Sequence, residues 1–163
     1  MPVMGPNVFA SEPDFTHGGV GLTSVTKAGG AELLGATVYE LEAGARWADL
    51  HVHFANEEMI VVLAGRPTLH TLEGSRELER GEVVVCKRGR AGAHRLENAT
   101  SEQARVLIVS TMLMPEVVEY PERDHVFVMT EAPYTDGVYD PEQHGRLLRV
   151  FERGGGKPVP PDS

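Results

Sequence analysis

The chain has 163 residues, of which 41% are hydrophobic and 24% are charged. This length and composition fit one folded domain with its own hydrophobic core, and they exclude a mainly disordered protein. Because 24 acidic residues outweigh 15 basic ones, the formal net charge of -9 disfavours nucleic acid and anionic membranes as partners. The only cysteine, Cys86, has no partner for an intramolecular disulfide.

The first ten residues, MPVMGPNVFA, lack the basic and apolar regions of a secretory signal. No apolar run approaches the ~20 residues that a membrane helix needs. We therefore expect a cytoplasmic protein.

The strands are expected mainly in the middle of the chain. Residues 1–30 are dense in Gly and Pro and predict an N-terminal arm with one strand near Val20–Thr26. Residues 31–115 alternate short segments rich in Val, Ile, Leu and Thr with Gly-containing turns, which favours an all-β sandwich or barrel. The expected strands there are Ala36–Leu41, Arg46–Phe54, Glu58–Leu63, Thr68–Thr71, Glu82–Cys86, His94–Asn98 and Arg105–Thr111.

Residues 116–153 form an extended C-terminal segment that we expect to pack on the barrel. It contains polar turn pairs and ends in GRLLRVFERGGG, which predicts a closing strand or a short helix. Residues 154–163 are rich in Gly and Pro, and this composition predicts a disordered tail.

Four side chains in the strand region have the chemistry of a metal site. His51 and His53 are two residues apart on one expected strand, so both imidazoles project from the same face. Glu58 opens the next strand after a tight turn, and a downstream strand supplies His94. Three imidazoles and one carboxylate suit a divalent manganese, iron, cobalt, nickel, copper or zinc ion. An octahedral ion would keep two open positions, as a reactive site requires.

The spacing of these residues resembles the first motif of the cupin family. The sequence gives Gly44, six residues, His51-Val-His53, four residues, Glu58, six residues and Gly65. The usual first spacer has five residues, so this chain has one extra residue in a turn. The carboxylate neighbour Glu57 competes with Glu58, but the six-residue spacing to the glycine selects Glu58.

The second cupin motif is also present, with two departures. It begins at Gly81, has Lys87 where the family has Pro, continues to Gly89, and ends with His94 and Asn98. The loop before His94 is two residues longer than usual. The departures change the turns and leave all four ligand positions occupied. The resemblance implies a double-stranded β-helix, or jelly roll, that holds a metal on the four residues.

Other side chains are candidates for the pocket around the ion. His70 lies on an expected strand and is a candidate catalytic base beside the metal, although a half-buried, hydrogen-bonded histidine is the more common case. Ordinary core packing is the alternative for the aromatic residues and the cysteine. The candidate pocket-lining residues are Tyr39, Trp47, Asp49, Ile60, Val62, Cys86 and Leu96.

The alternation of side chains also predicts how the barrel is covered. The face of Glu58–Leu63 opposite the pocket carries Met59, Val61 and Leu63, and all three are apolar. A sheet that faces water would alternate polar with apolar residues, so this outer face needs a cover. The N-terminal arm or a second subunit could supply it. The resemblance implies a homodimer.

Three classes of function remain open. The first is a metal-dependent enzyme, an oxygenase, isomerase or lyase, acting on a small organic molecule. The second is a non-catalytic barrel that binds a sugar or another effector. The third, a storage protein, is disfavoured because buried imidazoles and a carboxylate would otherwise need costly alternative partners. Fold and ligand type do not separate the first two.

Overall fold

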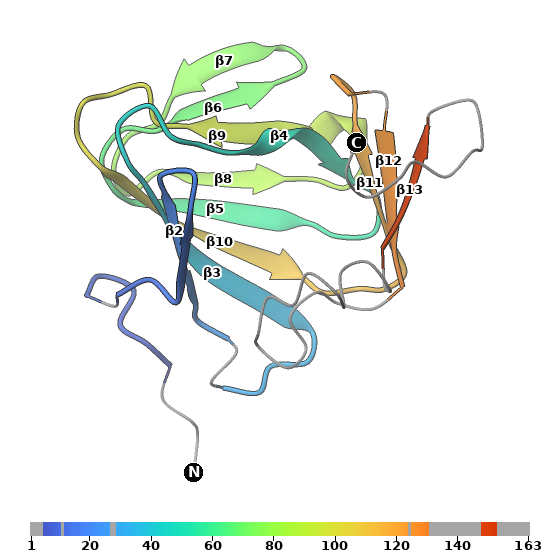
Figure 1. Ribbon diagram of the computed structural model, residues 1–163, viewed down its shortest axis with the longest axis horizontal. Coiled ribbons are helices and arrows are strands. Elements are labelled where there is room, and N and C mark those ends of the chain that lie inside the picture. The colour runs from blue at the N-terminus through green and yellow to red at the C-terminus, as the bar shows by residue number, and fades with distance from the viewer. Residues whose placement is uncertain (1–4, 11, 27–28, 124, 131–147, 153–163) are drawn as a thin grey trace.

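The computed structural model describes residues 5–10, 12–26, 29–123, 125–130 and 148–152. Figure 1 shows two antiparallel sheets that curve around a common interior. The first sheet has the strand order β1 (Phe15–His17), β2 (Val20–Ser24), β3 (Leu34–Leu41), β10 (Ala104–Thr111), β5 (Glu58–Ala64) and β8 (Val83–Cys86). The second has the order β13 (Leu148–Glu152), β12 (His125–Met129), β11 (Glu116–Tyr120), β4 (Arg46–His53), β9 (His94–Glu97), β6 (Thr68–Thr71) and β7 (Gly74–Glu77).

The all-β prediction is confirmed, and each of the seven strands expected in the middle of the chain is present within two residues at either end. The short 3-10 helix Arg90–Gly92 is the only helix in the described residues. No helix there has the length and apolar character needed to cross a membrane. Sequence patterns missed β7, because all four of its residues are exposed and show no apolar alternation. The expected tail, 154–163, lies outside the described residues.

Inward-facing side chains of the first sheet form rows across the barrel, and their polarity changes from one end to the other. At one end the row is apolar and buried, and it consists of Val20, Leu41 and Ala104. The next row consists of Leu22, Tyr39, Val106 and Val62, and the one after it of Ser24, Thr37, Ile108 and Ile60. The last row consists of Gly35, Ser110, Glu58 and Cys86. The polar chemistry of the barrel is therefore gathered at one end.

Two residues of the cupin-like motifs, Gly65 and Asn98, have structural roles that require their residue types. Gly65 has a positive φ of 73°, and a Cβ there would lie 2.7 Å from the Cα atom of Ala104. A side chain at this turn would therefore collide with the neighbouring strand. Asn98 is fully buried, and its amide nitrogen donates to the carbonyl oxygens of Leu41, Glu42 and Glu102 at 2.7–3.2 Å. One amide thus ties together two loops at the apolar end of the barrel.

Replacing Asn98 with alanine should lower the free energy of unfolding by about 2–3 kcal/mol, because several buried carbonyl groups would lose their donor. Urea denaturation checks this. The control is Gln103→Ala, since Gln103 makes an exposed hydrogen bond to Glu42, and its effect should stay within about 0.5 kcal/mol. Equal stability of the two variants would contradict the role given to Asn98.

Candidate metal centre

The strand β4 carries two of the expected ligands past an irregularity in its pairing with β9. Trp47 pairs with Leu96 and His51 pairs with His94, so three residues on β4 oppose one residue on β9. Within this bulge, Ala48 adopts a positive φ of 55°. Because the bulge adds two residues, an even number, the alternation of faces is preserved beyond it. The bulge therefore brings the imidazole of His51 directly opposite that of His94.

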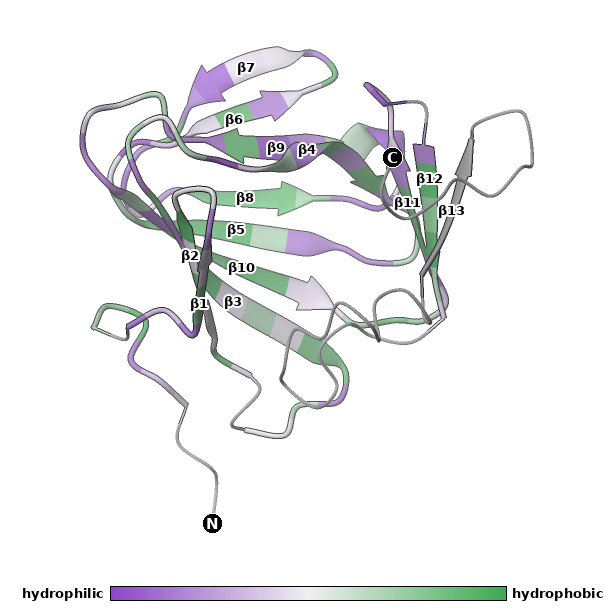
Figure 2. Cartoon of the chain, in the orientation of Figure 1, coloured by the Kyte–Doolittle hydropathy of each residue, from purple (hydrophilic) through white to green (hydrophobic). Residues whose placement is uncertain are grey.

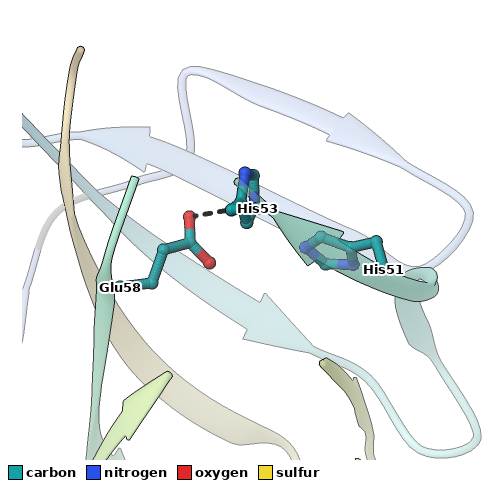
Figure 3. Close-up of side chains that lie close together, drawn as sticks. All are labelled: His51, His53 and Glu58. Atoms are coloured by element: carbon teal, nitrogen blue, oxygen red, sulfur yellow. Dashed lines mark ion pairs between the residues drawn. The ribbon is translucent and has the colours of Figure 1, made fainter. Parts of the chain in front are cut away.

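Three of the four predicted ligands form a compact group. One ligand atom from each of His51, His53 and Glu58 lies within 4.8 Å of the other two. Figure 3 shows the two imidazoles of β4 facing the carboxylate, which comes from the start of β5. His94 stands beside this group, with its Nε2 atom 2.8 Å from Oε2 of Glu58 and its ring 4.4 Å from that of His51. The fold thus brings all four predicted residues together.

Two of the three histidines, His51 and His94, are oriented by a backbone acceptor on their outer nitrogen. The Nδ1 atom of His51 lies 2.8 Å from the carbonyl oxygen of Asp49, and that of His94 lies 2.9 Å from the carbonyl oxygen of Gly92. A carbonyl can only accept, so Nδ1 carries the proton in both rings. The Nε2 atoms of His53 and His94 face Glu58. This is the orientation in which imidazoles ligate a metal through Nε2.

The electrostatics of the group place a proton among the ligands. Burial, followed by the nearby His94 and His53, lowers the pKa of His51 to about 3. Burial opposes the charged form of His94 as well, but Cys86 and Glu58 outweigh it and raise the pKa of His94 to about 10. Burial also opposes ionisation of Glu58, but the hydrogen bond from His94 and the neighbouring imidazoles lower its pKa to about 2. At neutral pH, His94 and Glu58 therefore form an ion pair beside a neutral His51.

Glu116, which sequence patterns did not single out, holds the turn between β4 and β5. Its side chain is fully buried, and Oε1 accepts hydrogen bonds from the backbone N–H groups of Phe54, Ala55 and Val117 at 2.9–3.1 Å. Its other oxygen accepts from the Asn56 amide and lies 3.6 Å from Nδ1 of His53. That nitrogen is buried and has no hydrogen-bond partner among the described residues. Glu116 is thus the carboxylate that faces the outer side of the second imidazole.

Tyr120 of β11 is a second residue that the sequence did not reveal. Its ring stacks on that of His51 with centroids 5.9 Å apart. Burial and the negative charge of Asp49 raise the pKa of Tyr120 to about 12, so the phenol keeps its proton. Asp49 itself pairs with Arg46 and Arg123. Asp49 therefore acts on the site through its backbone carbonyl and its charge.

The expected catalytic histidine, His70, lies on the other side of its sheet. Leu69 of β6 belongs to the buried core, and adjacent residues of a strand point to opposite faces. The His70 ring accordingly contacts Ser75 at 2.7 Å and Glu97 at 3.1 Å on the outer face. The expectation that His70 lies beside the metal ligands is therefore wrong, because Leu69 occupies the inward face of this strand.

A cavity of about 620 Å³ adjoins the cluster on the side of His53 and Glu58. Of the seven expected lining residues, Tyr39 forms part of its wall. Trp47 packs against Tyr39 with ring centroids 4.8 Å apart, at the border of the hydrophobic core. The other apolar candidates are buried in that core, and they are Ile60, Val62, Cys86 and Leu96.

Residues 37–110 match the cupin domain family. A crystal structure described as a sugar phosphate isomerase from a cupin superfamily of Silicibacter pomeroyi is 22% identical, with a TM-score of 0.73 over 89% of this chain and 83% of that chain. A structure from Acidithiobacillus ferrooxidans is 20% identical, with a TM-score of 0.70 over 86% and 81% of the two chains. The polyketide cyclase RemF from Streptomyces resistomycificus is 22% identical, with a TM-score of 0.51 over 67% and 73%. These likenesses confirm the double-stranded β-helix. No curated protein matches the chain.

The metal-free protein should be most stable near pH 6.5. Between pH 3 and 6.5 the unfolded chain binds a proton at His51 that the folded chain excludes, so stability rises with pH. Between pH 6.5 and 10 the folded chain keeps a proton on His94 that the unfolded chain releases, so stability falls. Each of these two histidines contributes a slope of at most about 1.4 kcal/mol per pH unit, and Glu58, whose pKa is lowered to about 2, steepens the rise below pH 4.5.

Urea denaturation of the metal-free protein across this range checks both limbs. The variant His51→Gln should flatten the acid limb, and His94→Gln should flatten the alkaline limb. Superimposable profiles for the wild type and both variants would refute the assignment of the proton.

Replacing Glu116 with glutamine should weaken metal binding by roughly 10–100-fold, because the amide keeps an acceptor for the backbone but loses the charge that faces His53. Titration with Co²⁺, followed by its visible absorption, measures both affinity and ligand geometry. Glu119→Gln is the matched control, since Glu119 lies on the same strand and pairs with Arg90. Unchanged affinity and spectrum in the Glu116 variant would remove this role.

Proposed function

We propose that this chain, of which residues 37–110 match the cupin domain family, binds one divalent transition-metal ion and acts on a small organic molecule in the adjoining cavity. The supporting observation is the convergence of ligand atoms within 4.8 Å, on imidazoles whose outer nitrogens face acceptors. The proposed ligands are His51, His53, Glu58 and His94.

The donor set fits such an ion. Imidazole nitrogen and carboxylate oxygen together suit manganese, iron, cobalt, nickel, copper and zinc. His51 is neutral and ready to bind, whereas His94 must release its proton when the ion takes its place beside Glu58. When bound, the ion supplies Lewis-acid polarisation of a substrate oxygen or carbonyl.

Two features of the chain would serve catalysis. The cavity wall includes His53 and Glu58, so a molecule held there reaches two of the ligands directly. Tyr120 keeps its phenolic proton against His51 and can donate a hydrogen bond at the edge of the site. We propose an isomerase or lyase if the native ion is zinc or nickel, and an oxygenase if it is iron. A non-catalytic binding barrel is the alternative.

Substitution of His51 or Glu58 by alanine should abolish stoichiometric metal binding. Plasma spectrometry on protein purified without a histidine tag measures the metal and identifies it. The matched control is His70→Ala, because this histidine lies on the outer face of its sheet and should leave the metal content unchanged. Full metal content in the His51 and Glu58 variants would refute the site. If both variants lose the metal, oxygen consumption by the iron-loaded wild type would favour the oxygenase over the isomerase or lyase.

We also propose that two copies associate through the outer face of β5 and β8. Met59, Val83 and Val85 are 38%, 53% and 59% exposed on this face, and Figure 2 shows β5 and β8 as largely hydrophobic. The outer face of β4 differs, because its residues Leu50 and Val52 are buried with Ala93 of the same chain. Among the described strands, the run of exposed apolar side chains Met59, Val83 and Val85 lies on the first sheet.

Sedimentation should give about twice the 17.7 kDa of one chain. Val85→Glu should convert the protein to monomers, because a charge would be buried at the centre of the contact. Leu72→Glu is the control, since Leu72 is 45% exposed in the β6–β7 turn. A wild-type monomer would end this proposal.

A further inference from the structure

The cavity beside the cluster has walls rich in hydroxyl groups. Its described lining includes Ser24, Thr26, Thr37, Tyr39 and Ser110. Strand register explains this concentration, because Ser24 pairs with Thr37 and Ser110 pairs with Glu58. Ser24, Thr37 and Ser110 therefore belong to the two rows at the polar end of the barrel. A ligand in the cavity meets hydroxyls, which both donate and accept hydrogen bonds.

Among the described residues of the cavity wall, the carboxylates are the only side chains that carry a permanent charge. No lysine or arginine is among the described residues that line it, and the charged ones are Glu32, Glu58 and Glu116. Glu58 belongs to the metal cluster, and Glu116 is held by backbone amides. A phosphate group is ordinarily held by arginine, lysine or converging backbone N–H groups. The described wall therefore disfavours binding of a phosphate ester whose phosphate does not contact the ion directly.

The remaining wall suits the carbon skeleton of a ligand. Met112, Met114 and Met129 line the cavity together with Ile108. Methionine side chains are flexible and polarisable, so they adapt their shape to the C–H groups of different ligands. The cavity thus combines hydroxyl partners on the sheet with an adaptable apolar surface.

We propose that this cavity takes a small uncharged polyhydroxy compound, a polyol or hydroxy carbonyl, and discriminates against its phosphate ester. The inference rests on the proposed function, because the ligand would place oxygens on the ion at His53 and Glu58. It departs from the likeness to the structure described as a sugar phosphate isomerase. The overall fold is similar, while the described lining of this cavity carries hydroxyls and carboxylates and no cation.

Calorimetric titration of the metal-loaded full chain tests the proposal. The probes are neutral polyols and hydroxy carbonyls of three to six carbons, each paired with its phosphate monoester. At least one neutral probe should bind, and its phosphate ester should bind at least about tenfold more weakly, a difference of 1.4 kcal/mol. A phosphate ester that binds more tightly than its neutral partner would overturn the inference. So would a panel in which no neutral probe binds.

Two variants locate the effect in the cavity. Thr37→Val removes one hydroxyl while keeping the shape of the side chain, and it should weaken binding of the neutral probe by roughly three- to tenfold. Glu32→Lys should reduce the difference in affinity between the neutral probe and its phosphate ester, because Glu32 is the exposed carboxylate of the wall. Glu73→Lys, in the distant β6–β7 turn, makes the same charge change and should leave that difference as it is. Equal responses of the two lysine variants would contradict the assignment to this cavity.

The metal content of every sample separates this inference from the proposed function. A protein that holds its metal but prefers phosphate esters would refute the proposed ligand class and leave the proposed metal site standing. A protein that binds neutral probes but takes up no metal would sink the proposed function instead.

Discussion

The rest of this structure depends on burying three imidazoles and a carboxylate at one point. Polar groups removed from water lose stabilising free energy unless each finds a partner. Two backbone carbonyls accept from the outer nitrogens of His51 and His94, and Glu116 faces that of His53. The inner nitrogens meet around Glu58, and the proton on His94 forms an ion pair with that carboxylate. The same arrangement, in which only Nδ1 of His53 among these ring nitrogens is buried without a hydrogen bond in the described part of the chain, provides a set of ligand atoms suited to a cation.

Long-range pairing is what makes this arrangement rigid. The turn that joins His53 to Glu58 is short, and its amides are fixed by a carboxylate 62 residues further along the chain. That carboxylate arrives because β11 pairs with the end of β4, where Val118 lies opposite His53. The C-terminal strands therefore hold the ligands as well as extending the sheet. A change in β11 can therefore act on the proposed metal ligands through the turn that Glu116 fixes.

The local part of this structure was predictable from sequence, and the non-local part was not. His51 and His53 share a face because strands alternate, and this rule needs no knowledge of the partner strands. The outward placement of His70 could also have been predicted, because the neighbouring apolar residue Leu69 is the one that is buried in the core. Glu116 gave no signal, since its role arises only when β11 pairs with β4. The cavity wall likewise depends on the register of β2, β3 and β10.

The division between metal site and cavity also follows the division of the chain. All four proposed ligands lie within residues 37–110, the segment that matches the cupin domain. Much of the cavity wall comes from outside this segment, including Ser24, Thr26, Glu32 and the methionines 112, 114 and 129. The shared segment fixes which donors meet, because strand pairing and burial leave them few alternatives. Apart from Glu116, which fixes the turn between His53 and Glu58, the flanking wall residues are free of that constraint, and so they can change the ligand while the metal site stays the same. This is why structural likeness at about 20% identity carries the barrel and not the substrate.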